Sequence, residues 1–562
     1  MSAVRSLRIR IGLTDAGSLF GLDDGRVYFR FDEAYALNPA RPILSMSFTG
    51  EDDVATRARL LDPLLPATFG AGNGKLPGFF RNLLPEGMLR KHLLSDAGLS
   101  PDDELGLLAY CGTDLPGDVW ALAETLDDVA LGRLLTQGHD ACRWTIGLLV
   151  APLPNAARVS DHTNARHRRG IDMTTSAHCF IPYPDAPVAA GTGPLSGLTF
   201  AVKDIFDVAG YPTGCGNPHM LALSGIKPAS ASVVRTLAEA GASFVGKTCT
   251  DELAFSMNGK NAHFGTPRNG GAPDRIPGGS SSGSASAVSN GLADIALGTD
   301  TGGSVRAPAS HCGLVGLRPT HARVSLQGAM DLAPDFDTCG WFTRDIDTFA
   351  RVGDVLLGDD TCALPDAPQV LLAVDVLDLL SPRVQQVFAD ALERLSPVLG
   401  TLHEVTTAAP SFDALYWAFR HIQGYQAWQQ HGACIEQYGL QLGPGVADRF
   451  SWSRTVTAAQ MLEYSAIRAT FAAHFAALLG NDKVMVLPSM PDIAPLLTDS
   501  ETALENYRNQ AIRMLCLSGL SGLPQISLPL MTIDGAPFGF SVIGPAGSDQ
   551  SLIAFARTLM EA

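Results

Sequence analysis

Serines that follow paired glycines supply the most informative candidate chemistry in this sequence. The motif GGSSSG contains Ser280, and the motif TDTGGS ends at Ser304. The second motif follows ADIALG, an apolar segment that predicts a buried strand, and Ser304 is expected to begin the next helix. Glycines at 302 and 303 leave the neighbouring backbone amides unobstructed, so several N–H groups at a helix N-terminus could stabilise an oxyanion. Acyl transfer needs this arrangement.

A serine nucleophile also needs a base, and the sequence offers a lysine for that role. A lysine held neutral by burial can accept a proton through a second hydroxyl group. Lys203 ends LTFAV, a predicted apolar strand, so its aliphatic stem is expected to be buried. Taken singly, Ser304 is more typical of a helix N-cap, and Lys203 of a solvated cation at a strand end. The functional argument therefore depends on the joint occurrence of these residues.

The order and spacing of Lys203, Ser280 and Ser304 resemble the amidase signature family. That family carries a Ser, cis-Ser, Lys triad on a GGSS motif and a downstream GGS motif, and AVKDIFDVAG supplies the lysine here. The resemblance extends from about residue 195 to residue 562. It implies an α/β amidase signature fold, with a large mixed β-sheet covered by helices on both faces.

The resemblance also implies a role for each residue of the triad. An uncharged Lys203 accepts a proton from Ser280, which takes one from Ser304 as the Ser304 hydroxyl attacks an amide carbonyl. Ser280 then protonates the leaving amine, and water hydrolyses the acyl-enzyme. The family mechanism implies no metal and no organic cofactor.

Two further groups of residues match family positions around the triad. The first group supplies backbone N–H donors to the oxyanion: Thr301, Gly302, Gly303 and Ser304. The second group holds the loop and the proton relay in place: Ser281, Asp300 and Arg306. An equally good interpretation of Asp300 and Arg306 is a purely structural ion pair.

Within the family, the segments SMNGKNAHFGTPRN and AMDLAPDFDTCGWFTRD most resemble the plant amidases that hydrolyse indole-3-acetamide. This implies a small arylalkyl or aliphatic primary amide as the substrate, cleaved to a carboxylic acid and ammonia. Two alternatives stay open. One is an amidotransferase component that acts on misacylated tRNA, and the other is a non-catalytic toxin–antitoxin interaction protein.

The front of the chain resembles a different family. RNLLPEGMLR and the following DDELGLLAYCGTDLPGDV are similar to the N-terminal subdomain of HipA-type toxin kinases, over about residues 1–120. No kinase motif follows, so kinase activity is not expected, and we interpret this segment as a packing or interaction module. The resemblance implies a helix-turn-helix antitoxin as its partner. The sequence leaves open whether the protein forms a homodimer.

The expected elements divide the chain into three parts. A small α+β domain spans 1–125, a linker without helical or strand periodicity spans 126–172, and the amidase-like domain spans 173–562. In the third part LTFAV, SFVG, QVLLAV, KVMVLP and PQISLPL predict strands that alternate with helices, as in a mixed or parallel sheet covered by helices. Met173 is a natural start for an amidase, which suggests the fusion of two reading frames.

Composition limits the classes of partner. The 562 residues are 46% hydrophobic and 17% charged, which is typical of a globular protein, and the formal net charge of −17 disfavours binding to nucleic acid or to an anionic membrane. The ten cysteines form no CxxC pair, so neither a zinc site nor a disulfide framework is expected. No secretory signal or membrane span is recognisable. We therefore expect a cytoplasmic protein that acts on a small molecule.

Several other residues suggest chemistry that their context does not favour. GASFVGKT, beginning at Gly241, satisfies the phosphate-loop pattern, but a helix is expected before it and its SFV forms the strand, which is the reverse of a phosphate loop. Cys215 and Cys312 are interpreted as buried hydrophobic residues rather than as nucleophiles. His263 and His311 are interpreted as structural hydrogen-bond partners.

Overall fold

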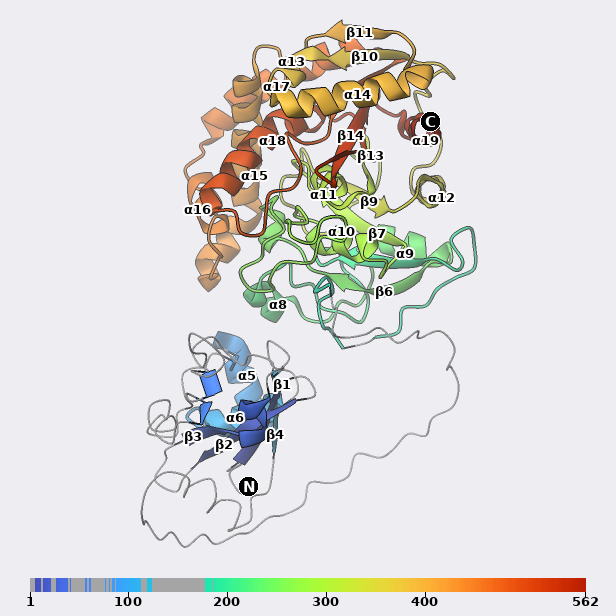
Figure 1. Cartoon of the computed structure of the whole chain (residues 1–562). Helices are drawn as coiled ribbons and strands as arrows, with labels where there is room; N and C mark the ends of the chain where they lie inside the picture. Colours follow the sequence, from blue (N-terminus) through green and yellow to red (C-terminus); the bar gives the residue numbers. More distant parts are fainter. Residues whose placement is uncertain are drawn as a thin grey trace, which may run out of the picture. The chain divides into compact units, whose positions relative to one another are not determined.

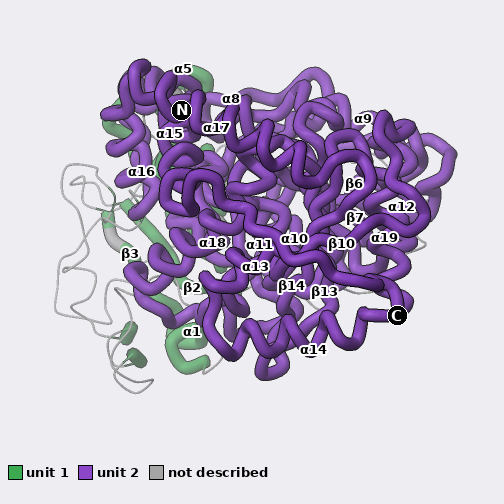
Figure 2. Tube along the Cα trace, turned by 90° about the horizontal axis from the view of Figure 1, so that it is seen from above, with its two compact units in different colours: residues 1–166 green, residues 167–562 purple. Residues whose placement is uncertain are grey.

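The chain folds into two compact units, residues 1–166 and residues 167–562 (Figure 2). The computed structural model describes residues 6–11, 14–21, 27–38, 41, 56–57, 60–61, 76, 80, 83–85, 87–112, 119–123, 177–184 and 186–562. The predicted linker and the suggested start at Met173 lie outside these residues. Each unit has a hydrophobic core of its own.

The first unit is a four-stranded antiparallel sheet with helices, in the strand order β3-β2-β1-β4. Its elements are β1 (Ser6–Ile11), β2 (Thr14–Gly21), β3 (Val27–Phe31), α1 (Glu33–Leu37), α5 (Gly87–Ala97), α6 (Glu104–Cys111) and β4 (Val119–Ala123). Leu7 and Ile9 alternate along β1 and enter a core that includes Leu107 and Leu108 of α6. The small α+β unit expected at the front of the chain is confirmed.

The second unit is built on a ten-stranded sheet with the order β11-β10-β12-β14-β13-β8-β9-β7-β5-β6 (Figure 1). Its strands are β5 (Thr199–Lys203), β6 (Ser243–Thr248), β7 (Ile295–Asp300), β8 (Val315–Arg318), β9 (Thr338–Thr343), β10 (Gln369–Ala373), β11 (Leu402–Val405), β12 (Lys483–Pro488), β13 (Gln525–Ile533) and β14 (Ala536–Ile543). The pairs β5–β6 and β5–β7 are parallel, whereas β7–β9 and β13–β14 are antiparallel. The predicted mixed sheet is confirmed, and so is each strand predicted from an apolar run.

Helices cover this sheet. They are α8 (Pro218–Ser224), α9 (Ser232–Glu239), the 3₁₀ turn η4 (Glu252–Ala254), α10 (Ser282–Ser289), α11 (Arg306–Cys312), α12 (Ile346–Leu356), α13 (Val374–Leu377), α14 (Pro382–Leu399), α15 (Phe412–Tyr438), α16 (Val446–Ser453), α17 (Ala458–Leu479), α18 (Glu501–Ser521) and α19 (Asp549–Glu561). Helix α10 packs on β5 and β7, and α11 packs on β13 and β14. Helices α15 to α18 form a group beside the sheet (Figure 1). None of the helices that the structure describes has the length and apolar character needed to cross a bilayer.

The turn between β7 and α11 departs from the sequence prediction. The helix begins at Arg306 rather than at Ser304. The reason is Asp300, whose carboxylate accepts the backbone N–H groups of Gly303, Val305 and Arg306 at 2.9, 3.1 and 3.2 Å. Asp300 thus supplies the capping interactions that a serine would otherwise make, and Ser304 lies in the turn before the helix.

Close packing explains both glycines of this turn. A Cβ atom on Gly302 would lie 2.7 Å from the Phe419 ring of α15. A Cβ atom on Gly303, which has φ +120°, would lie 2.4 Å from the Leu515 side chain of α18. Both distances are shorter than carbon atoms tolerate, so a larger residue at either position would require the Phe419 or Leu515 side chain to move, and the positive φ of Gly303 itself favours glycine.

Candidate active site

Lys203 and Ser280 form the centre of the candidate site. Lys203, at the end of β5, is fully buried, and Ser280, before α10, is 1% exposed. The Lys203 Nζ donates to Ser280 Oγ at 2.7 Å and to Thr299 Oγ1 of β7 at 2.8 Å. Parallel pairing of β5 with β7 brings the ends of both strands to one edge, which explains why residues so distant in sequence meet. The sequence analysis did not single out Thr299.

The environment of Lys203 favours its uncharged form. Burial lowers the pKa of the Lys203 amine from 10.5 to about 7, although the carboxyl groups of Asp251, Asp337 and Asp300 act in the opposite direction. The amine is therefore close to half protonated at neutral pH, whereas an exposed lysine is almost fully charged. A neutral amine can accept a proton from the hydroxyl that contacts it.

Backbone contacts fix Ser280 and Ser281. The Gly279–Ser280 peptide bond is cis, and the Ser280 carbonyl accepts hydrogen bonds from the backbone N–H of Asp251 at 3.0 Å and the Thr250 hydroxyl at 3.0 Å. The Ser281 Oγ donates to the Thr299 carbonyl at 3.2 Å and accepts from the Thr299 N–H at 3.3 Å. Ser281 thereby ties the start of α10 to the residue that also contacts Lys203.

Ser304 lies beside this pair without completing a hydrogen-bonded chain. Its carbonyl accepts from the Ser281 N–H at 3.4 Å, which places the two turns side by side. Within the part of the chain that the structure describes, the Ser304 hydroxyl has no hydrogen bond to Ser280 or to any other group. Ser304 is 5% exposed and lines a pocket, so its hydroxyl is neither an N-cap nor a partner in the core.

The backbone amides of the turn fall into two sets. The N–H of Gly303 donates to Asp300, as described above. The N–H groups of Thr301, Gly302 and Ser304 make no hydrogen bond to any described residue. These three donors are therefore available to an oxyanion near the Ser304 hydroxyl, whereas that of Gly303 holds the turn.

Asp300 and Arg306 form part of a buried ionic cluster that the turn requires. Arg306 Nη2 lies 2.8 Å and Arg318 Nη1 3.1 Å from Asp300 Oδ1, and all three side chains are fully buried. Burial alone would raise the pKa of the Asp300 carboxyl, but the two guanidinium charges and the hydrogen bonds outweigh it and lower the pKa. Arg306 also donates to the Leu515 carbonyl at 2.9 Å and to Gln525 Oε1 at 2.6 Å. The pair is structural, and it holds the turn that carries Ser304.

Arg318 was absent from the sequence interpretation. It ends the short apolar strand β8, as Lys203 ends β5, and this shared pattern of a cation at the end of a buried strand is the signal that could have found it.

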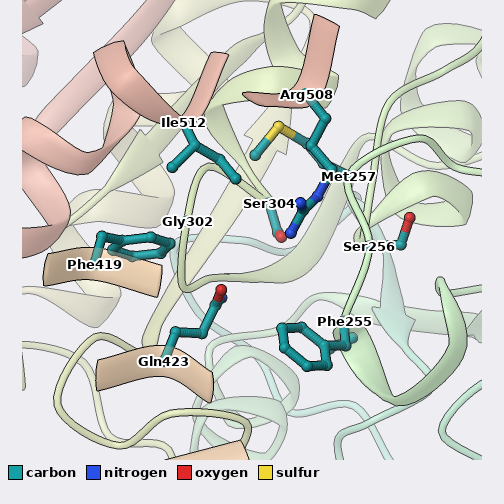
Figure 3. Close-up of a pocket in the computed structure, with 10 residues that line it drawn as sticks. Phe255, Ser256, Met257, Gly302, Ser304, Phe419, Gln423, Arg508 and Ile512 are labelled. Atoms are coloured by element: carbon teal, nitrogen blue, oxygen red, sulfur yellow. The ribbon is translucent and has the colours of Figure 1, made fainter. Parts of the chain in front are cut away.

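A small pocket opens onto Ser304 (Figure 3). Apolar groups line much of it, and Gln423 of α15 and Arg508 of α18 add polar groups. In Figure 3 the Arg508 side chain extends from α18 toward Ser304, and the Gln423 amide points into the same space. The remaining lining residues are Ala254, Phe255, Ser256, Met257, Gly302, Phe419 and Ile512.

The cysteines and histidines near the motifs have structural surroundings. Burial raises the thiol pKa of both Cys215 and Cys312 to about 12, so neither is an activated nucleophile. His311 Nε2 lies 2.8 Å from the Tyr507 hydroxyl, and burial lowers the His311 pKa to about 3. His263 Nε2 contacts Glu252 Oε1 at 2.9 Å. These contacts agree with the structural interpretation of all four residues.

The phosphate-loop pattern is likewise structural. Its lysine, Lys247, lies within strand β6, contacts Asp204 Oδ1 at 2.7 Å and donates to the Pro212 carbonyl at 2.6 Å. A buried lysine with these partners cannot reach a phosphate. In the described ranges, no group of three or more His, Cys, Asp or Glu residues is arranged to hold a metal ion.

Comparison with known proteins identifies the family to which the second unit is similar. The family model "Amidase" matches residues 183–409, a range that contains Lys203, Ser280 and Ser304. Amidase 1 of Arabidopsis thaliana is 38% identical over 405 residues, which cover 66% of this chain and 95% of the relative. The chain belongs to the amidase signature family.

Other amidase-family relatives are similar over the same part of the chain. A solved structure described as a crystal structure of amidase has a TM-score of 0.60 and 32% identity, and covers 66% of this chain and 85% of the other. A glutamyl-tRNA(Gln) amidotransferase subunit from Akkermansia muciniphila is 32% identical over 434 residues, which cover 68% of this chain and 91% of the relative.

The front of this amidase-family chain matches a second family model, "HipA N-terminal domain", over residues 7–122. The chain therefore joins a HipA N-terminal domain to an amidase-family hydrolase.

Proposed function

We propose that the protein hydrolyses the C–N bond of a small primary carboxamide to a carboxylic acid and ammonia, with Ser304 as the nucleophile. The observation that carries this proposal is the 2.7 Å contact between a fully buried Lys203 amine and the Ser280 hydroxyl. Such a pair is a base that acts through a hydroxyl, and it lies next to the turn that presents Ser304 to a pocket.

In the first half of the reaction, protons move from Ser304 through Ser280 to Lys203. As the Ser304 hydroxyl attacks the amide carbonyl, its proton passes to Ser280, whose own proton passes to the Lys203 amine. Hydrogen bonds of this kind are often long in free enzymes and tighten when the substrate binds, which is consistent with the missing contact between the two hydroxyls. The negative charge that develops on the substrate oxygen accepts hydrogen bonds from the amides of Thr301, Gly302 and Ser304.

The second half returns the protons. The Lys203 ammonium restores the proton of Ser280, which donates to the departing nitrogen so that ammonia rather than an amide anion leaves. Water then attacks the ester on Ser304, with the same relay acting as the base, and the carboxylic acid is released. Every proton that leaves Ser304 is accounted for by the two other side chains of the triad.

The substrate class follows from the pocket and the relatives. The pocket at Ser304 is small and ten residues line it, which favours a small substrate. Aromatic and aliphatic walls such as Phe255, Phe419 and Ile512 suit an arylalkyl or aliphatic acyl group. The similarity to Amidase 1 supports hydrolysis of an amide. The resemblance of SMNGKNAHFGTPRN and AMDLAPDFDTCGWFTRD to plant amidases favours an indole-acetamide-like substrate.

The test is hydrolysis of a panel of amides by the full chain and by Ser304→Ala. The panel contains indole-3-acetamide, phenylacetamide and short aliphatic amides, and released ammonia is measured. We expect Ser304→Ala to lower kcat/KM by at least about 1,000-fold, because nothing else supplies the nucleophile. Ser243→Ala, at an exposed position on β6, is the matched control and should keep wild-type activity. Equal rates for Ser304→Ala and the wild type would contradict the proposal.

The amidotransferase alternative is supported by the similarity to the glutamyl-tRNA(Gln) amidotransferase chain of Akkermansia muciniphila. It predicts that the protein releases ammonia from glutamine and does so efficiently only with partner proteins. Glutaminase activity that emerges on reconstitution with such partners, and no hydrolysis of simple amides, would favour this alternative.

A further inference from the structure

Two buried polar side chains in the pocket carry atoms for which the fold supplies no partner. Arg508 is 3% exposed and Gln423 is 5% exposed. Neither Arg508 Nε nor Gln423 Oε1 has a hydrogen bond to any residue in the described part of the chain. Buried polar atoms are nearly always paired, so unpaired ones that line a pocket beside a nucleophile indicate a ligand that pairs them.

The charge around Arg508 is unbalanced. Its ion-pair partner is Glu505, whose Oε1 lies 3.1 Å from Arg508 Nη1, but Arg449 Nη1 also lies 3.4 Å from Glu505 Oε2. One carboxylate is thus shared by two guanidinium groups, and at 41% exposure solvent screens its charge. Burial, followed by the charges of Arg449 and Arg420, lowers the pKa of Arg508 to about 9. Arg508 therefore contributes a positive charge to the pocket wall whose carboxylate partner is shared and partly exposed.

The position of the Arg508 guanidinium indicates which chemical groups the ligand carries. Arg508 extends toward Ser304 from α18 (Figure 3), so one small molecule in the pocket can contact both side chains. A guanidinium presents parallel N–H donors that match the two oxygens of a carboxylate. Between the two ends of such a molecule, Met257 and Ile512 offer apolar contact for a short carbon chain.

We propose that Arg508 binds a carboxylate on the acyl part of the substrate, so that the preferred substrates are monoamides of short dicarboxylic acids. The proposal rests on the amidase activity proposed above and, among small primary amides, favours an acyl group that carries a carboxylate over an arylalkyl one. Gln423 supplies a further hydrogen bond to a polar group of the same substrate. Arg508 is in this account a binding residue that decides specificity, while the triad performs the chemistry.

The test compares three amides of nearly equal length on the full chain. Succinamate ends in a carboxylate, 4-oxopentanamide ends in a neutral acceptor, and pentanamide ends in an alkyl group. We expect kcat/KM for succinamate to exceed that for pentanamide by about tenfold or more, because a charge-assisted hydrogen bond contributes roughly that much. In Arg508→Gln the ratio should fall to within about threefold of one, and Arg508→Lys should give an intermediate ratio.

Arg513→Gln is the matched control, because Arg513 lies on the same helix and pairs with the exposed Asp413 rather than lining the pocket. It should keep the wild-type ratio. For variants whose hydrolysis is too slow to measure, the affinity for succinamate is measured instead. Calorimetry should detect binding of succinamate to the Ser304→Ala variant. In the double variant that carries both Ser304→Ala and Arg508→Gln, that binding should be weaker by about tenfold or more.

The outcomes separate the two proposals. If the wild type cleaves pentanamide as well as succinamate, or cleaves succinamate and 4-oxopentanamide equally well, recognition of a carboxylate is overturned and amide hydrolysis stands. If no amide is cleaved but Ser304→Ala binds succinamate in an Arg508-dependent manner, the hydrolase proposal fails and the carboxylate site stands.

Discussion

At the scale of the residue, Lys203 shows how burial lowers the pKa of a common side chain, as the proposed proton relay requires. The Lys203 amine lies between two hydroxyl groups, those of Ser280 and Thr299. No carboxylate is among its hydrogen-bond partners in the described chain. A carboxylate in contact would have kept the amine protonated, whereas hydroxyls accept a hydrogen bond without adding a charge. The low pKa is therefore a consequence of burial, which the hydroxyl contacts of Nζ do not offset with a negative charge.

This predicts the pH dependence of activity. The active form of Lys203 is uncharged, and its pKa is about 7, so kcat/KM should rise with pH and level off above about pH 7. Below that value, activity should fall by about tenfold for each pH unit as the amine becomes protonated. Phenylacetamide is a suitable substrate because it does not titrate in this range. Circular dichroism at each pH controls for unfolding, and a flat profile between pH 5 and pH 8 would exclude Lys203 as the base.

At the scale of the element, the turn from β7 to α11 depends on one carboxylate. Asp300 accepts three backbone N–H groups and pairs with Arg306 and Arg318, so a single side chain shapes the turn and is the ion-pair partner of two buried guanidinium groups. The glycines at 302 and 303 then let the turn pass beneath α15 and α18. The geometry of the nucleophile thus depends on elements far away in the sequence.

We predict that Asp300→Asn destabilises the protein strongly. The substitution keeps the shape but leaves the Arg306 and Arg318 charges buried without a counter-ion, a change that costs about 3–5 kcal/mol of the free energy of unfolding. Asp347→Asn is the control, because Asp347 pairs at the surface with the exposed Arg557 and should cost less than about 1 kcal/mol. Urea unfolding of both variants measures the difference. Similar losses in the two variants would show that the buried cluster contributes no special stability.

The same elements show what the sequence could predict. The strands β5, β7, β12 and β13 are recognisable because each is a local apolar run, and local patterns need no knowledge of distant contacts. The start of α11 was predicted too early, since Asp300 caps the helix from the preceding strand. Gln423 and Arg508 could not be found, because their position on the pocket depends on how α15 and α18 pack against a turn more than a hundred residues earlier.

At the scale of the whole molecule, the chain combines two units with separate cores. The HipA N-terminal domain matches residues 7–122, and the amidase match begins at residue 183. The triad and every residue that lines the pocket belong to the second unit. The domain boundaries at 125 and 172 remain predictions, because no local pattern between the two matches identifies where a folded domain stops. A helix-turn-helix partner for the front unit also remains a prediction.

This separation predicts that the second unit works alone. A truncated chain that begins at Met173 should be soluble and should cleave amides with a kcat/KM within about threefold of the full chain. The physical reason is that the second unit has its own ten-stranded sheet and its own hydrophobic core. Ammonia release by the two chains, measured side by side, checks this expectation.

Thermal unfolding of both chains supplies the control, because independent domains unfold in separate transitions. The full chain should show two transitions, and the truncated chain should keep the one that a bound substrate acid stabilises. If the truncated chain instead aggregates, or if its remaining transition shifts down by many degrees, then residues before Met173 contribute to the stability of the amidase core. In that case the two reading frames would have become one folding unit after their fusion, and the front domain would be required for the chemistry even though it supplies none of the groups that perform it.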